Sequence, residues 1–325
     1  MVDEVLGSGS DIRAQTAPTS NGTPGAVVAP HGFSVRYSPG APIGHWHDVI
    51  VMEDGRTGIL IGRCADADIA RQSRSAARSV LLATADPVRA LDRVLGSSAS
   101  VLCAVIDGEK IGYSGHGDSN AAMSGPDAPG SILSPADARL RVVDLTPGAT
   151  VLLCTGPAGP AAAALDRCES VHPDQVADEV MNQLAGAAVT AVLYRHPPEP
   201  LTITLAAQPA GLAVSRGRLR RWLESAGVDA EVGGDVLLAV GEATANATEH
   251  AVIGATGDVA ITVTAALIGG RLRLAVSDNG VWKPASALPG HRGHGIRLIN
   301  ALVDSAELTT TPEGTTVEMV KELRP

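Results

Sequence analysis

Three polar residues spaced four apart give this sequence its clearest capacity for chemistry: Glu242, Asn246 and His250. Apolar residues recur at intervals of three and four through 235–251, which predicts an amphipathic helix. The apolar positions are Val236, Leu237, Val240, Ala243 and Ala247. The polar residues then share one stripe, where a carboxylate can act as a base and an amide oxygen can ligate Mg²⁺. The stripe could serve phosphoryl transfer, or it could be an ordinary solvated helix face.

A hairpin and a carboxylate follow this helix. Apolar residues alternate through 257–265 and 271–277, and Gly269-Gly270 lies between the two runs, which predicts a β-hairpin. The second strand leads directly into Asp278-Asn279-Gly280. A carboxylate at this strand end could accept a hydrogen bond from an exocyclic amine, and the glycine lets the backbone turn sharply.

Two glycine-containing segments come next. A loop over 281–292 is followed by Gly293-His294-Gly295, which opens a predicted helix whose first amides can face phosphate oxygens. The last predicted strand begins at Gly314-Thr315-Thr316, with small and hydroxyl side chains beside the base pocket. Each motif is weak by itself, and it is their shared order that predicts a nucleotide pocket.

The order and spacing of these motifs resemble those of the GHKL ATPase superfamily and, within it, the anti-sigma-factor serine kinases of bacteria. Residues 242–250 match the helix motif E-x-x-x-N-x-x-x-H, 278–280 match D-x-G, 293–295 match G-x-G and 314–315 match the final G-T. The resemblance covers about residues 201–325. It implies a Bergerat-type α/β sandwich with a mixed sheet that binds ATP and Mg²⁺.

The resemblance also implies a role for each matching residue. Glu242 would be the general base toward a protein hydroxyl, Asn246 the Mg²⁺ ligand and Asp278 the adenine contact. The remaining cofactor-binding positions would be Gly280, Gly293, Gly295, Gly314 and Thr315. Kinases of this group commonly have an arginine between the two lid glycines, where this chain has His294, and the nearby Arg292 could substitute.

Other protein classes with the same kind of nucleotide pocket fit the sequence less well. Histidine kinases need a phosphoacceptor histidine before the ATPase domain, and residues 197–235 offer none. Topoisomerases and chaperone ATPases carry transducer domains after the ATP site, whereas this sequence ends at Pro325. The segment before the ATP site instead predicts a short basic helix, either a solvated face or a partner-binding face. Its arginines are Arg216, Arg218, Arg220 and Arg221.

Residues 35–194 resemble a second family, the metal-dependent Ser/Thr phosphatases found with bacterial sporulation and stress regulators. The matches are 43–48 to G-G-D-W-Y-D, 62–63 to G-D, 111–117 to Y-S-x-A-G-H, 151–156 to L-L-L-Y-T-D-G and 187–195 to D-D-x-x-x-L-V-x-R. The metal-bearing positions of the family are occupied here by His45, Arg63, Gly156 and Ala187 or Ala188.

This second family needs two hard cations, bridged by carboxylates, to activate a water. Because Arg63 would place a positive charge at a cation position, we expect residues 31–196 to form a pseudophosphatase: a β-sandwich flanked by helices, without the activity. The alternative is a softer metal held by clustered Asp and His side chains, which are more often solvated or helix N-caps. Those side chains are His45, His47, Asp48, Asp66 and Asp68.

The length of 325 residues allows two domains. We expect a disordered tail over 1–30, the phosphatase-like domain over 31–196, a proline-rich linker over 197–200 and the ATP-binding domain over 201–325. The net charge of −10 argues against a nucleic-acid partner. No signal-peptide core or membrane-length apolar run occurs, which favours a cytoplasmic protein without membrane contact. Cys103 and Cys154 lie in apolar strand patterns, so buried thiols are expected.

The sequence therefore predicts a two-domain α+β regulator of sigma-factor activity. Its C-terminal domain would use ATP and Mg²⁺ to phosphorylate a Ser or Thr of a STAS-type anti-sigma-factor antagonist, and the pseudophosphatase domain would be a sensor or scaffold. A sigma factor is a further candidate partner, and a homodimer stays open. The alternative is a non-catalytic switch in which bound nucleotide only changes partner affinity. Glu242 favours catalysis, whereas His294 and the inactive neighbour favour the switch.

Overall fold

The computed structural model describes most of the chain between residues 31 and 323. The described ranges are 31–38, 43–96, 98–125, 128–133, 138–156, 158–168, 172–184, 189–250, 259–280 and 294–323. The tail over 1–30, the loop over 281–292, Gly293, and Ala187 and Ala188 lie outside these ranges, so the expectations about them stay predictions.

Two five-stranded sheets form the N-terminal half, with the orders β2-β3-β4-β5-β8 and β1-β10-β9-β6-β7. All of their strand pairs are antiparallel. The strands are β1 (Phe33–Tyr37), β2 (His45–Val51), β3 (Thr57–Cys64), β4 (Ser98–Asp107), β5 (Lys110–His116), β6 (Ser119–Gly125), β7 (Ala128–Leu133), β8 (Arg141–Asp144), β9 (Thr150–Thr155) and β10 (Thr190–Arg195).

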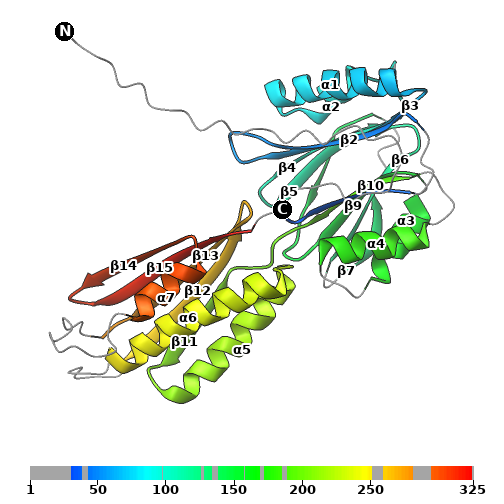
Figure 1. Ribbon diagram of the computed structural model, residues 1–325. Coiled ribbons are helices and arrows are strands. Elements are labelled where there is room, and N and C mark those ends of the chain that lie inside the picture. The colour runs from blue at the N-terminus through cyan, green and yellow to red at the C-terminus, as the bar shows by residue number, and fades with distance from the viewer. Residues whose placement is uncertain are drawn as a thin grey trace, which may run out of the picture.

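Helices cover the outer side of each sheet, so this half is layered α/β/β/α (Figure 1). The first sheet carries α1 (Ala67–Thr84) and α2 (Pro87–Asp92), and the second carries α3 (Ala158–Asp166) and α4 (Pro173–Gln183). Strand β3 shows how alternation divides the core: Ile59 and Ile61 face the opposite sheet, whereas Leu60 faces α1. Cys103 and Cys154 are buried, as predicted.

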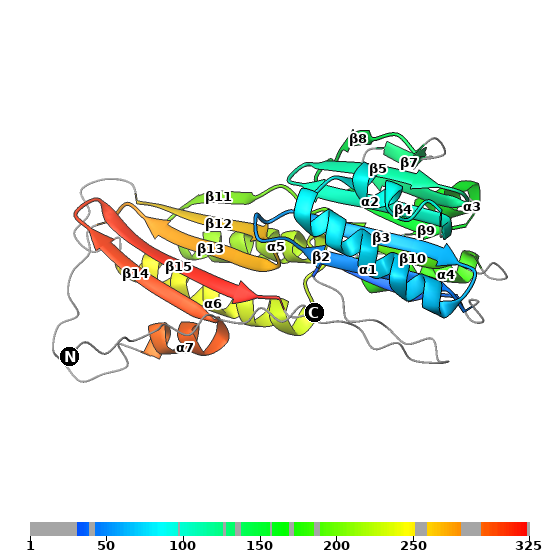
Figure 2. The same cartoon turned by 90° about the horizontal axis from the view of Figure 1, so that it is seen from above.

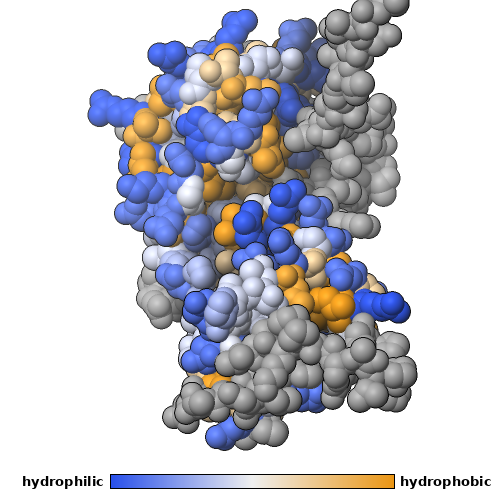
Figure 3. Space-filling model, turned by 90° about the vertical axis from the view of Figure 1, so that its left-hand side faces the viewer, coloured by the Kyte–Doolittle hydropathy of each residue, from blue (hydrophilic) through white to orange (hydrophobic). Residues whose placement is uncertain are grey.

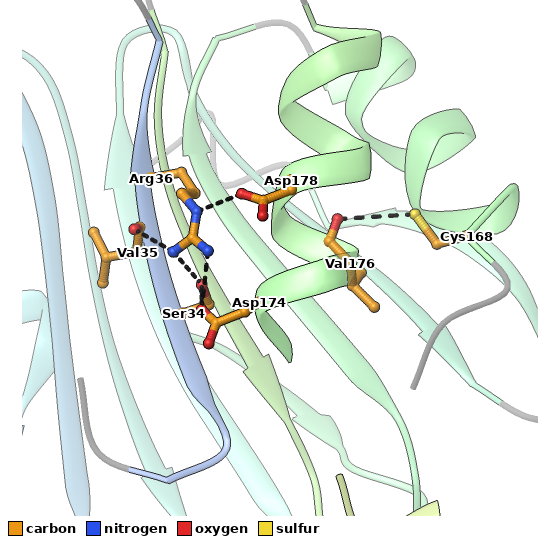
Figure 4. A network of polar contacts seen from close by, with 7 residues as sticks. All are labelled: Ser34, Val35, Arg36, Cys168, Asp174, Val176 and Asp178. Atoms are coloured by element: carbon orange, nitrogen blue, oxygen red, sulfur yellow. Dashed lines mark hydrogen bonds and ion pairs between the residues drawn. The ribbon is translucent and has the colours of Figure 1, made fainter. Parts of the chain in front are cut away.

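Arg36 connects the edge strand β1 to α4 by hydrogen bonds and ion pairs. Arg36 donates to Asp174 at 3.0 Å and to Asp178 at 2.6 Å, and Ser34 donates to Asp174 at 2.7 Å (Figure 4). The Arg36 side chain is only 15% exposed, so these charge-assisted bonds form in a partly desolvated setting. They hold β1, and with it the paired strand β10, at the edge of the second sheet.

The C-terminal half has one sheet with helices on one face (Figures 1 and 2). Its strands, in the order β11-β12-β13-β15-β14, are β11 (Leu201–Ala206), β12 (Ala260–Ile268), β13 (Arg271–Asp278), β14 (Ser305–Thr311) and β15 (Gly314–Glu322). The helices are α5 (Pro209–Ser225), α6 (Ala230–His250) and α7 (His294–Leu302). The apolar positions predicted for α6 all belong to or pack against the core of this half, which confirms its amphipathic pattern.

The strand pairing of this sheet differs from the predicted mixed sheet, because every pair is antiparallel. The reason is the position of β15. Strands β13 and β14 run in the same direction and are joined through α7, but β15 lies between them and pairs with both. The predicted α+β class and the predicted hairpin are both confirmed. Gly269 and Gly270 join the hairpin with φ of 57° and 75°, the two positive φ values of a type I′ turn.

The proline-rich segment between the halves contacts both of them. The Pro197 carbonyl accepts a hydrogen bond from the Gly148 amide at 3.1 Å, and the Glu199 carbonyl accepts one from Trp222 Nε1 at 2.7 Å. The segment is therefore tethered at both ends.

The face of the molecule in Figure 3 is mainly hydrophilic, with separate apolar spots. Exposed large apolar side chains come from different elements, among them Val51 of β2, Leu82 of α1, Ile268 of β12 and Leu308 of β14. Such scattered residues are normal for a protein surface. Within the described ranges, no helix has the length and apolar character needed to cross a bilayer.

Candidate functional site

The helix that carries the polar stripe starts earlier than predicted. It begins at Ala230 rather than at residue 235, because Asp229 acts as its N-cap. The Asp229 carboxylate accepts from the Glu231 amide at 2.8 Å, and its carbonyl accepts from the Gly233 amide at 2.7 Å. Because of this cap, the helix also includes Gly233 and Gly234, in a segment where apolar periodicity does not predict a helix.

The polar stripe of α6 meets the start of α7. Glu242 and Asn246 are half-buried, and Gly295 lies directly against both. A Cβ at Gly295 would stand 2.5 Å from Glu242 Oε1 and 2.8 Å from Asn246 Nδ2. A glycine is therefore needed at this position if the carboxylate and the amide are to keep their places. Two motifs that are far apart in the sequence come together here, as their order predicted.

Asp278 lies at the carboxyl end of β13, half-buried. Its carboxylate accepts a hydrogen bond from the Gly280 amide at 2.9 Å. Burial raises the pKa of this carboxyl, against the opposite effect of the backbone amides of Gly280 and Thr315. The carboxylate is thus oriented by the turn that follows it.

The Gly314-Thr315 motif lies beside Asp278. Thr315 is the direct register partner of Asp278 between β15 and β13. Gly314 has a φ of 148°, and a Cβ there would overlap the backbone carbonyl of Asp278. The two segments can approach so closely only with a glycine at this position.

These two groups lie at the same end of the C-terminal half, where α6 and β13 finish and the β14–β15 turn occurs (Figure 1). The first group consists of the Glu242 carboxylate and the Asn246 amide at the start of α7. The second consists of the half-buried Asp278 carboxylate and the Gly314 backbone packed against the same residue. Gly293 lies outside the described residues, and so do the surroundings of the His250 and His294 side chains.

Two features near this site were not predicted. Asn279 joins the start of β12 to the end of β13: its side-chain oxygen accepts from the Ala260 amide at 2.7 Å. Arg216 of α5 places Nη2 3.7 Å from where a Cβ of Gly241 would lie, next to Glu242. All four arginines predicted on α5 are exposed, as a solvated face requires. An Asn that follows an Asp at a strand end is a weak sequence signal, and it could have indicated the contact between Asn279 and the Ala260 amide.

The N-terminal half has a polar group at one end of its sandwich. His45 pairs in register with Arg63, and Arg63 with Ser100, across β2, β3 and β4. His45 Nδ1 is 2.7 Å from Thr190 Oγ1 on the opposite sheet, and Arg63 donates to Asp118 at 3.2 Å. Burial and then the charge of Arg63 lower the pKa of His45 to about 4, so its ring is neutral.

The glycines of this region preserve the backbone pattern although the acids are absent. A Cβ at Gly62 would lie 2.5 Å from the Trp46 indole, and Gly44 lies against the backbone carbonyl of Cys64. Packing therefore explains both glycines without a metal.

The alternative set of metal ligands does not converge. His47 faces the opposite sheet, where its Nδ1 contacts the Tyr37 hydroxyl, whereas Asp48 faces α1 and pairs with Arg78 at 2.7 Å and Arg74 at 3.4 Å. Strand alternation separates the two residues. Asp66 instead caps α1, accepting from the amides of Asp68 and Ile69, both at 2.9 Å. Asp68 pairs with Arg71. The structure therefore does not bring these five side chains together as one set of ligands.

Comparison with protein families identifies the C-terminal half. Residues 205–321 match the family described as the histidine kinase-like ATPase domain. The match contains Glu242, Asn246, Asp278 and the glycines that lie against them. Residues 205–321 form a histidine kinase-like ATPase domain. The predicted membership of this half is thereby confirmed, and we call it the ATPase domain.

One solved structure matches the fold of both halves over 92% of this chain. The RsbU and RsbW domains of Rv1364c from Mycobacterium tuberculosis align with a TM-score of 0.57 at 23% identity, covering 92% of this chain and 97% of that one. The phosphatase domain of SpoIIE from Bacillus subtilis aligns with 0.36 at 10% identity, covering 51% and 94%. The catalytic domain of the phosphatase PstP, with two manganese ions, aligns with 0.37 at 14% identity, covering 50% and 96%. The N-terminal half has the metal-dependent phosphatase-like fold, followed by the ATPase domain.

The N-terminal half is expected to hydrolyse no phosphoserine peptide when Mn²⁺ is supplied. Arg63 stands where the family resemblance predicts a metal-bearing acid, and Asp48 is paired with Arg74 and Arg78. The measurement is phosphate release by the full chain. Turnover that disappears both with a chelator and in His45→Ala would show that an altered metal site works.

Proposed function

We propose that this protein regulates sigma-factor activity and that its ATPase domain phosphorylates a serine or threonine of an anti-sigma-factor antagonist. The observation that carries this proposal is the meeting of Glu242 and Asn246 with Gly295 at the start of α7. The fold shared with a structure that joins RsbU and RsbW domains supports a regulator built from the same two parts.

The residues present fit ATP and Mg²⁺. Gly295 and Gly314 allow the start of α7 and the start of β15 to lie closer to Glu242 and to Asp278 than a residue with a Cβ could. The Asp278 carboxylate, oriented by the Gly280 amide, can accept from the exocyclic amine of adenine. The amide oxygen of Asn246 is a ligand of the type that Mg²⁺ accepts. When bound, the ion neutralises charge on the phosphates, which side chains alone do poorly.

Glu242 has the position and chemistry of a general base. Its side chain is half-buried and lies against Gly295 at the start of α7. The amides at a helix N-terminus favour anions such as phosphate groups. In the proposed reaction the carboxylate accepts the proton of the incoming hydroxyl as the hydroxyl oxygen bonds to the γ-phosphorus of ATP. The bond between that phosphorus and the β–γ bridging oxygen breaks at the same time, and ADP leaves. Asn246, one turn later on α6, holds the phosphate side of the site.

The N-terminal domain acts in this proposal as a sensor or scaffold. Its sandwich is retained, while Arg63 and the occupied Asp48 argue against hydrolysis. The partner that best suits such a kinase is a STAS-type antagonist, with a sigma factor as a second candidate. Exposed arginines on α5 suit an acidic surface on either partner.

Wild-type protein is expected to bind ATP in a Mg²⁺-dependent way, and Asn246→Ala to lose most of that dependence. Removing an oxygen ligand should weaken ATP binding in the presence of Mg²⁺ by at least about tenfold. The effect on ATP binding in the absence of Mg²⁺ should be much smaller. Titration calorimetry on the full chain, with and without Mg²⁺, measures both values.

The matched control is Asn300→Ala, because Asn300 is an exposed residue of α7 whose side chain donates to the Ile296 carbonyl of the same helix. Its ATP affinity should equal that of the wild type. Absence of Mg²⁺-dependent nucleotide binding by the wild type would remove the proposed function.

A further inference from the structure

Polar side chains close one end of the layer between the two N-terminal sheets. Along β3, Ile59 and Ile61 face the opposite sheet and belong to the inter-sheet core, so Arg63, two residues further, points into the same layer. On the neighbouring strands, His45 and Ser100 are the direct register partners of Arg63. The first sheet thus presents an imidazole, a guanidinium and a hydroxyl in a row.

The second sheet presents hydroxyl groups opposite this row. Leu153 and Ala121 belong to the inter-sheet core, so Thr155 and Ser119, each two residues away, point into the same layer. Thr190 also faces it, since its hydroxyl contacts His45 Nδ1. We call this set the polar end of the sandwich: His45, Arg63, Ser100, Ser119, Thr155 and Thr190.

Some polar atoms of the polar end have incomplete hydrogen bonding among the described residues. The hydroxyl of Ser119, a residue only 1% exposed, and Nε2 of His45 are buried and have no partner among the described residues. Arg63 uses only Nη2, toward Asp118 at 3.2 Å and, weakly, Ser100 at 3.5 Å. Buried polar atoms without partners are costly, and the Ser119 hydroxyl can donate to an acceptor that completes it.

We propose that the polar end of the sandwich binds a phosphate monoester, such as the side chain of a phosphoserine, without hydrolysing it. A guanidinium matches phosphate oxygens with parallel N–H donors, and hydroxyl and neutral imidazole N–H groups supply further donors. The Arg63 side chain is 33% exposed, so its free nitrogens can be reached from solvent. No bound cation is needed, because the positive charge comes from Arg63.

This inference deepens the proposed function and rests on it for biological meaning, because phosphoserine is the product of the proposed kinase. The N-terminal domain would then sense the phosphorylated antagonist. Phosphate binding itself does not depend on ATP binding, so the two ideas can fail separately.

Asp118 competes with the ligand for Arg63. Its side chain is 78% exposed and holds Arg63 by an ion pair at 3.2 Å, while its backbone is fixed by the Ser100 hydroxyl and the Gly156 amide. A carboxylate on an exposed side chain can be displaced by a more highly charged anion. Removing its charge should therefore strengthen ligand binding.

The test is calorimetric titration of O-phosphoserine, and separately of inorganic phosphate, into the full chain at fixed ionic strength. Arg63→Gln should weaken O-phosphoserine binding by about tenfold or more, since it removes a charge-assisted contact. Ser119→Ala should weaken it by a few fold, whereas Asp118→Asn should tighten it about threefold. Unphosphorylated serine should not bind.

Arg56→Gln is the matched control, because Arg56 precedes the same strand and pairs with Asp54 in an exposed turn. It should bind as the wild type does. Equal losses in Arg56→Gln and Arg63→Gln would overturn the proposal, as would unchanged binding in Arg63→Gln. If Arg63→Gln does not fold, unchanged binding in Ser119→Ala overturns it. Binding of inorganic phosphate without O-phosphoserine would show an adventitious ion only.

Discussion

Replacing Glu242 with glutamine is expected to lower phosphoryl transfer by about two to four orders of magnitude, with nucleotide binding nearly unchanged. Glutamine keeps the shape and packing of the side chain against Gly295 but cannot accept a proton. The measurement is transfer of labelled phosphate from ATP to candidate antagonists encoded in the same genome, with ATP affinity determined in parallel.

The control for this substitution is Glu249→Gln. Glu249 lies on the same helix but is exposed, so the charge change is the same while the site is untouched. Its transfer rate should match that of the wild type. Equal rates for Glu242→Gln and wild type would exclude Glu242 as the base. A wild type that binds its partner according to bound nucleotide, yet never phosphorylates it, would favour the non-catalytic switch.

Gly314→Ala is expected to destabilise the ATPase domain by about 3 kcal/mol or more. The added methyl group would overlap the Asp278 carbonyl, which is backbone and cannot rotate away, and the φ of 148° is strained for alanine. Strands β13 and β15 would have to separate where Asp278 and Thr315 pair. Denaturant unfolding followed by circular dichroism measures the loss.

Gly234→Ala is the opposite case and serves as the control. Gly234 is exposed on α6, and a Cβ there meets nothing within 4 Å. Alanine in a helix interior should stabilise the domain by about 0.5–1 kcal/mol. If the two variants had the same stability, the close approach of Gly314 to Asp278 would not exist in solution.

Local patterns in the sequence were sufficient for much of the ATPase domain. The periodicity of α6, the glycine turn of the hairpin and the position of Asp278 at a strand end all depend on neighbouring residues, so they could be predicted directly. The early start of α6 could not be predicted from periodicity, because it depends on the Asp229 cap and passes through two glycines.

Strand β14 was not predicted, because it is an edge strand. Its sequence, SAELTTT, is almost entirely exposed, so no alternation of apolar residues marks it. Only pairing with β15 makes it a strand, and the insertion of β15 between β13 and β14 makes the sheet antiparallel. Both facts concern which distant segments lie side by side.

By itself, the sequence supplied the candidate residues for the chemistry that we propose: Glu242, Asn246 and Asp278 in the ATPase domain. It also placed His45 and Arg63 where the phosphatase family has acids. Only the tertiary structure decided what those residues face. It set Gly295 against Glu242, turned Asp48 toward Arg74 and Arg78, and gathered His45 and Arg63 with hydroxyl groups of the opposite sheet. The physical reason is that residue type and spacing report local conformation, whereas these contacts join segments whose approach depends on the packing of whole sheets and helices.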